Sequence, residues 1–292
     1  DASIVLVRTQ LRGDIAPEPA SLATFDHAIA YVPSLDLFLD GTAEWVGSTE
    51  LAPTIRGSLG LIVNPDGTGK LVRLPEPGPE GATMKRRVEA VLSKDGSAQL
   101  ELAVEASGAN AAGWRQRYHA EATRRERAVR DIGEALPGFE LAPNGLRIND
   151  LDDLEQPVRM QAKGKAPGFA RRDGADLSLS PGMKPRLVKR YATASTRKHE
   201  LRLPVQSLAE EDVVLVLPEG MTVKSAPEPA KGETPFGSYE LQVEKEPGKV
   251  RVRTRLQLTK TRISPAEYAA FRAFCETVDR AFAQRLVIGE AQ

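Results

Sequence analysis

A histidine and an aspartate near the start of the chain have a spacing that could support proton transfer. His27 lies in an apolar segment, residues 25–32, and Asp40 ends the next apolar segment, residues 35–39. If the two segments pair as antiparallel strands around a turn at residues 33–36, the two side chains come together. A carboxylate bonded to one ring nitrogen fixes the histidine tautomer and leaves the other nitrogen to accept a proton from a nucleophile. His27 and Asp40 are therefore our candidate catalytic residues.

The same spacing also has a purely structural interpretation. A histidine that bonds a strand-edge aspartate is a common structural pair, and nothing in the spacing distinguishes it from a catalytic one. Asp26 is adjacent to His27 but projects to the other face of the strand, so it is not a candidate partner. The sequence therefore leaves both interpretations of His27 and Asp40 open.

The chain has one cysteine and three histidines, and this limits the chemistry that it can carry. Disulfides within the chain and multi-cysteine metal sites are excluded, and the histidines at 27, 119 and 199 show no ligand spacing. We expect no metal and no cofactor. Cys275 lies in the middle of a predicted helix, on its apolar face, which is typical of a small buried hydrophobic residue. Without another thiol, the chain alone should be inactive as a cysteine enzyme.

Composition and motifs exclude several further classes of protein. Forty basic and forty acidic residues give no net charge, so nucleic acid is not an expected partner. The chain has no run of 18 apolar residues that could span a membrane, and it has no phosphate-binding or serine-hydrolase motif. The arginines within residues 124–130 alternate with acidic residues, which indicates a solvated helix face. Trp45 could line a cleft, although a buried aromatic at a strand end is the simpler interpretation.

The elements that must position these residues form a mainly β chain of the α+β class. Short apolar runs separated by turn residues predict antiparallel strands over residues 1–74, including a hairpin at Asn64-Pro65-Asp66-Gly67. Residues 84–292 predict a β-sandwich with a hairpin at Asp95-Gly96 and one long inserted helix near residues 111–136. Ser264, with Glu267 three residues later, forms a capping box that starts a C-terminal helix over residues 265–285.

Charge and composition also divide the chain. Residues 1–70 carry four basic and nine acidic residues, a net charge of −5, so the remainder carries +5. Residues 75–83 are dense in proline and glycine and cannot continue a helix or a central strand. We therefore expect one domain over residues 1–74, a linker over 75–83 and a second domain over 84–292.

The residues around His27 and Asp40 resemble the second half of a bacterial transglutaminase-like domain of the papain-type cysteine superfamily. In that family the catalytic residues follow the order Cys, His, Asp, with the histidine in an F-[ND]-H-A motif and the aspartate in an L-D-x-T motif. Residues 25–28 and 39–42 match both motifs, except that Gly41 stands where proline is usual. Residues 235–240 and 263–274 are similar to the last β domain and closing helix in one group of these proteins, whose β-rich domains have no known function.

This resemblance implies a partial catalytic domain followed by a β-rich domain. It implies a larger, exported bacterial parent protein, with the nucleophilic cysteine on a helix ahead of Asp1, and the absence of an initiator methionine fits a processed or truncated piece. The implied activity is acyl transfer or hydrolysis at an amide of a protein or peptide substrate, with His27 as base and Asp40 orienting it. The alternative is a non-catalytic β-sandwich module that binds a protein or cell-envelope partner and keeps His27 and Asp40 as relics.

Overall fold

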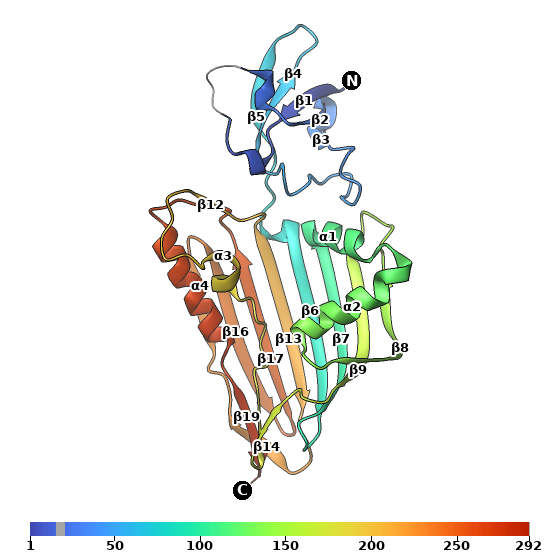
Figure 1. The fold of residues 1–292 in the computed structure, drawn as a ribbon, viewed down its shortest axis with the longest axis vertical. Coiled ribbons are helices and arrows are strands. Elements are labelled where there is room, and N and C mark those ends of the chain that lie inside the picture. Colours follow the sequence, from blue (N-terminus) through green and yellow to red (C-terminus); the bar gives the residue numbers. More distant parts are fainter. Residues whose placement is uncertain (16–20, 292) are drawn as a thin grey trace.

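The computed structural model describes residues 1–15 and 21–291. The chain is mainly β with few helices, so the predicted α+β class is confirmed. Figure 1 shows a small lobe near the N-terminus and a large lobe. The small lobe is built on a five-stranded sheet and the large lobe on an eight-stranded sheet. Each lobe has its own cluster of buried hydrophobic side chains.

The small lobe is an antiparallel sheet with the strand order β3-β2-β1-β4-β5. Its strands are β1 (Ser3–Val7), β2 (His27–Val32), β3 (Leu37–Leu39), β4 (Leu59–Val63) and β5 (Gly69–Arg73). The predicted hairpin at Asn64-Pro65-Asp66-Gly67 joins β4 to β5, and Gly67 has the positive φ of 82° that this turn requires.

The two faces of the small sheet differ in how they are covered. One face packs against the loop over residues 40–58 and buries seven side chains: Val5, Val7, Ile29, Leu51, Ile55, Ile62 and Leu74. The opposite face carries apolar side chains that stay exposed, among them Ile4 at 61%, Leu71 at 54% and Val63 at 37%. Within the described residues, this second face of the small sheet therefore has no covering layer.

The large lobe contains one sheet of eight strands in the order β15-β16-β17-β13-β6-β7-β9-β8. The strands are β6 (Ala82–Leu92), β7 (Ala98–Gly108), β8 (Glu140–Asn149), β9 (Val158–Ala166), β13 (Ser207–Val216), β15 (Ala230–Thr234), β16 (Gly237–Glu246) and β17 (Lys249–Leu258). Neighbours pair antiparallel except β6 and β13, which pair in parallel at the centre. The sheet therefore consists of two antiparallel halves joined along one parallel seam.

Alternation of apolar and polar residues sets the two faces of this sheet. In β17 every second residue from Val250 to Leu258 is buried, and the residues between them are mostly arginines on the outer face. The same alternation runs through β7 and β9. The predicted turn at Asp95-Gly96 joins β6 to β7, with Gly96 at a φ of 88°.

Within the described residues, four α-helices and a second sheet cover the inner face of the large sheet. The helices are α1 (Ala109–Tyr118), α2 (Glu121–Ala135), α3 (Leu187–Tyr191) and α4 (Tyr268–Phe282). The second sheet has the order β10-β11-β19-β14, with strands β10 (Arg171–Asp173), β11 (Asp176–Leu179), β19 (Leu286–Glu290) and β14 (Met221–Ser225). Figure 1 shows α1 and α2 over one half of the large sheet, and α3 and α4 over the other half.

The prediction of one long helix over residues 111–136 is wrong, because the helix is interrupted at His119 and Ala120. Ala120 adopts an extended conformation, with ψ at 109°, between α1 and α2. The Arg124 side chain donates hydrogen bonds to the carbonyls of Tyr118 and His119, at 2.7 and 2.8 Å, and so satisfies the end of α1. The Tyr118 hydroxyl also donates to Asp131 at 2.6 Å, which holds α2 against α1. Both helices keep the same apolar spacing, so periodicity alone could not reveal the break.

The C-terminal helix is shorter than predicted, although its capping box forms. The Ser264 backbone N–H donates to Glu267 Oε2 at 3.1 Å, and the Glu267 N–H donates to Ser264 Oγ at 3.3 Å. The α-helix itself begins at Tyr268 and ends at Phe282. The following residues form β19, whose alternating apolar side chains fit between β11 and β14.

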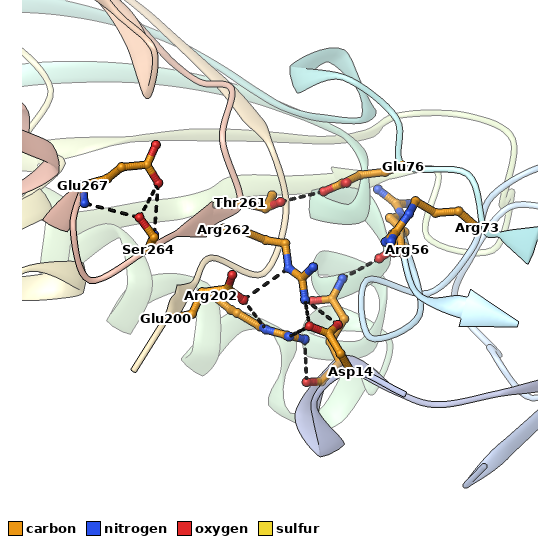
Figure 2. Close-up of polar contacts among 12 residues, drawn as sticks. Asp14, Arg56, Arg73, Glu76, Glu200, Arg202, Thr261, Arg262, Ser264 and Glu267 are labelled. Atoms are coloured by element: carbon orange, nitrogen blue, oxygen red, sulfur yellow. Dashed lines mark hydrogen bonds and ion pairs between the residues drawn. The ribbon is translucent and has the colours of Figure 1, made fainter. Parts of the chain in front are cut away.

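The two lobes meet through polar groups rather than through a shared apolar core (Figure 2). Asp14 of the small lobe forms ion pairs with Arg202, at 2.9 Å, and with Arg262. These arginines lie in the short antiparallel pair of β12 (Leu201–Arg202) and β18 (Arg262–Ile263). A second contact joins Thr261 Oγ1, as donor, to Glu76 Oε1 at 2.8 Å.

Candidate functional site

The structure brings His27 and Asp40 together. His27 is the first residue of β2, and Asp40 directly follows β3. The two strands pair antiparallel around a short turn in which Asp36 has a φ of 49°, so the predicted hairpin is confirmed. His27 Nε2 lies 2.9 Å from Asp40 Oδ2, within hydrogen-bond distance.

Asp40 is held by hydrogen bonds on both of its carboxylate oxygens. Oδ1 accepts from the Thr42 backbone N–H at 3.1 Å and from the Thr42 hydroxyl at 2.7 Å, while Oδ2 faces His27. The Asp40 side chain is only 2% exposed. Burial would raise the pKa of Asp40, but the hydrogen bonds from Thr42 and His27 outweigh it and hold this pKa below its ordinary value. The carboxylate is therefore ionised and fixed, as a group that orients a histidine must be.

The contact with Asp40 decides which ring nitrogen of His27 is available for chemistry. Because Asp40 bonds Nε2, the proton on that nitrogen points to the carboxylate and Nδ1 carries the free lone pair. No group in residues 1–15 and 21–291 forms a hydrogen bond with Nδ1. The His27 side chain is 22% exposed, so a reacting group can approach the ring. The arrangement can accept a proton at Nδ1 and stabilise the imidazolium that forms.

Asp26 points away from this pair and has a different partner set. It accepts hydrogen bonds from the Thr9 backbone at 2.8 Å and the Thr9 hydroxyl at 2.7 Å, and it lies 3.3 Å from the Arg12 guanidinium. Burial opposes these contacts, but they outweigh it and lower the pKa of Asp26. Asp26 therefore anchors the segment that follows β1, in agreement with its predicted orientation.

The chain's own thiol cannot serve His27. Cys275 is fully buried in the middle of α4, in the large lobe, as the sequence predicted. Burial, together with the nearby Asp279 carboxylate, raises its pKa to about 12. A neutral, inaccessible thiol on another element is a packing residue and not a nucleophile.

The loop that follows Asp40 contacts the large lobe through Trp45, which the sequence indicated as a possible cleft residue, and through Arg115, which it did not indicate. Trp45 is half-buried in this loop rather than at a strand end, and its ring packs against His119 at 4.7 Å between centroids. The Trp45 carbonyl accepts a hydrogen bond from Arg115 at 3.3 Å. Arg115 is 2% exposed and also donates to the carbonyls of Asp153 and Gln156, at 2.8 and 2.5 Å.

Helical spacing could have indicated the role of Arg115. It lies three or four residues from each of the other buried residues of α1, namely Ala111, Ala112 and Tyr118. A charged residue on the buried face of a helix requires polar partners, because an unpaired buried charge is costly. Arg115 finds them in backbone carbonyls of both lobes, and so it links the loop after Asp40 to the large lobe.

The described parts of the chain contain neither a cluster of metal-ligating side chains nor a helix that could span a membrane. Across residues 1–15 and 21–291, no three His, Cys, Asp or Glu side chains gather where a metal ion could be held. No helix in the same ranges has the length and apolar character needed to cross a membrane.

Comparisons with known proteins bear on the fold. Residues 176–288 match the model of a family described as a domain of unknown function with a solved structure, DUF3858. A crystal structure of a protein from Parabacteroides distasonis, described as a putative protease, matches 99% of this chain with a TM-score of 0.50 and 15% sequence identity. This match shows a shared fold, and the chain spans 40% of the length of that protein. Among curated proteins, none matches the chain.

Proposed function

We propose that His27 and Asp40 are the base and the orienting acid of a Cys-His-Asp acyl-transfer site. The observation that carries this proposal is the contact of Asp40 with Nε2 of a partly exposed histidine, which leaves Nδ1 free. The resemblance of the surrounding motifs to transglutaminase-like domains supports it. The L-D-x-T motif also gains a physical meaning, since the Thr42 backbone and hydroxyl hold the carboxylate in place.

In this proposal the thiol comes from sequence outside the 292 residues. This chain matches only 40% of the length of the P. distasonis protein, which is described as a putative protease. The rest of that protein leaves room for such a segment. The exposed apolar face around Ile4, Val63 and Leu71 is one on which further chain could pack. We also propose that the chain divides into domains at 1–74 and 84–292, with residues 75–83 between them; the separate hydrophobic clusters support this division.

The proposed reaction proceeds through a thioester. Nδ1 of His27 takes the thiol proton, and the thiolate sulfur attacks the carbonyl carbon of an amide. The imidazolium, stabilised by Asp40, then gives its proton to the leaving amine as the carbon–nitrogen bond breaks. Water or a second amine attacks the thioester and releases the thiol, which gives hydrolysis or acyl transfer.

The test uses the parent protein with its full N-terminal sequence. Turnover of an amide substrate should fall by about 10³-fold or more in His27→Ala, and by a smaller factor in Asp40→Ala. His199→Ala is the matched control, because His199 is an exposed histidine of the large lobe. Amide turnover that survives in His27→Ala would show that this histidine is not the base.

A second candidate function is a binding module, and the outer face of the large sheet favours it. This face contains a hollow of about 540 Å³ with side chains of both charge signs around it. On the same two strands as some of these charged side chains, Val91 of β6 and Val216 of β13 form an exposed cross-strand pair, with 52% and 39% of each residue exposed. Such a face suits an extended peptide with mixed charges. A parent protein that binds peptides through this face but lacks any reactive cysteine would favour this function.

A further inference from the structure

A second site lies in the large lobe, where the two halves of the sheet meet. Two adjacent cavities open above β6 and β13, between the end of α2 and the segment over residues 179–186. The outer cavity has a volume of about 490 Å³ and the inner one about 210 Å³. They share the four residues Arg86, Asp131, Ala135 and Glu211. We call the two together the seam cavity; the outer part alone has the size of a small-molecule site, about 300–1,000 Å³.

The floor of the seam cavity contains a buried glutamate, Glu211, with one carboxylate oxygen that has no hydrogen-bond partner within the described residues. Glu211 of β13 and Arg86 of β6 are opposite each other across the parallel seam and form an ion pair. The Glu211 side chain is 4% exposed, and its Oε2 has no hydrogen-bond partner among residues 1–15 and 21–291. Buried carboxylate oxygens are normally satisfied, because an unpaired one costs free energy. Glu211 lines both cavities, and it therefore brings an acceptor without a donor to the place where they meet.

The inner cavity is apolar and adaptable. Its lining includes three methionines and a tryptophan, namely Met84, Met160, Met183 and Trp114. Methionine side chains are flexible and polarisable, and they fit apolar groups of varied shape, aromatic rings in particular. Exposed residues line both cavities, among them Lys184 and Arg186 on the outer one and Ala135, which the two share. A small molecule can therefore enter from outside and place an apolar group next to Glu211.

We propose that the seam cavity binds a neutral small molecule that combines a bulky apolar group with one N–H or O–H donor. The apolar group occupies the inner cavity, and the donor bonds Glu211 Oε2. A neutral ligand fits best, since Arg86 already balances the charge of Glu211. Burial raises the pKa of Glu211 above its ordinary value, and the Arg86 guanidinium opposes only part of this rise. The ion pair with Arg86 supports the carboxylate form that accepts this bond.

The experiment compares two probes that differ only in the donor. N-phenyl-1-naphthylamine is a neutral aromatic molecule with one N–H, and 1-benzylnaphthalene has a CH₂ group in its place. Each is titrated into the 292-residue chain, with probe fluorescence and calorimetry as readouts. We expect one molecule bound per chain and about tenfold tighter binding of the amine, the effect of one hydrogen bond to a charged group. Equal affinity for the two probes, or no binding of either, would overturn the proposal; the second result would leave an ordered water as the partner of Glu211.

Two variants separate the donor contact from the apolar contact. Glu211→Gln turns an amide N–H toward the cavity while its oxygen faces Arg86, so the preference for the amine should disappear. Ala209→Phe fills the inner cavity and keeps both Arg86 and Glu211, so it should abolish binding of both probes, even if Glu211→Gln fails to fold. Ala269→Phe makes the same change at an exposed position of α4 and should leave binding unchanged. Tight binding in Ala209→Phe would place the probe elsewhere and refute the assignment.

Discussion

Replacing Thr254 by valine should stabilise the large lobe. Thr254 lies on β17, directly opposite Glu211, and is 3% exposed. Its hydroxyl oxygen has no hydrogen-bond partner within the described ranges 1–15 and 21–291. A buried hydroxyl without a partner costs about 1–3 kcal/mol, and valine has nearly the same shape with a methyl group in place of the hydroxyl. We expect the free energy of unfolding to rise by about 1–2 kcal/mol.

The assay is urea unfolding followed by far-UV circular dichroism, in which the midpoint should rise while the slope stays constant. Thermal unfolding should shift upward by about 3 °C for each kcal/mol. Thr83→Val is the matched control, because Thr83 is also buried but its hydroxyl donates to the Glu80 carbonyl at 3.1 Å. This control should lose about 1 kcal/mol. A loss of stability in Thr254→Val as well would refute the reasoning, since it would mean that the Thr254 hydroxyl has a partner in solution.

Three further predictions concern the capping box, the thiol and the contact between the lobes. Ser264→Ala should lower the free energy of unfolding by about 1 kcal/mol, measured by urea unfolding. Hydrogen bonds from Lys260 and Ser264 lower the pKa of Glu267 to about 2 from its ordinary 4.5. The contribution of the Glu267 carboxylate to stability is therefore complete above pH 4.5 and is lost as the pH falls through 2. Cys275 should react with Ellman's reagent at pH 8 only after unfolding, and rapid reaction of the native chain would contradict its burial. Asp14→Asn should speed proteolytic cleavage within residues 75–83, because it weakens the ion pairs that hold the small lobe; an unchanged cleavage rate would show that these pairs do not restrain it.

Local signals predicted much of the fold. Turn residues such as Asp95-Gly96 located hairpins because the backbone there must adopt positive φ, a requirement visible in any sequence. The approach of His27 to Asp40 was predictable for the same reason, since a short turn fixes which residues of a hairpin come close. The role of the pair in catalysis stays a prediction.

Partnerships between distant segments could not be predicted. The parallel pairing of β6 with β13, and with it the Arg86–Glu211 ion pair, joins segments more than 100 residues apart. Alternation shows which side chains face the core, but it contains no information on which strand lies alongside. The short strands β10, β15 and β18 could not be located in the sequence, because two to five residues show too little periodicity. Arg115 was missed because its partners are backbone carbonyls of remote loops.

The parallel seam at the centre of the large sheet also has a consequence for how the chain is made. Strands β6, β7, β8 and β9 can assemble as soon as residue 166 has left the ribosome, but β13 is completed only at residue 216. During that interval the pairing edge of β6 is open to other nascent chains. Closing the seam requires a loop of more than 100 residues, so it should be a slow step of folding. Chaperones that shield exposed strand edges would then matter most between these two points of synthesis.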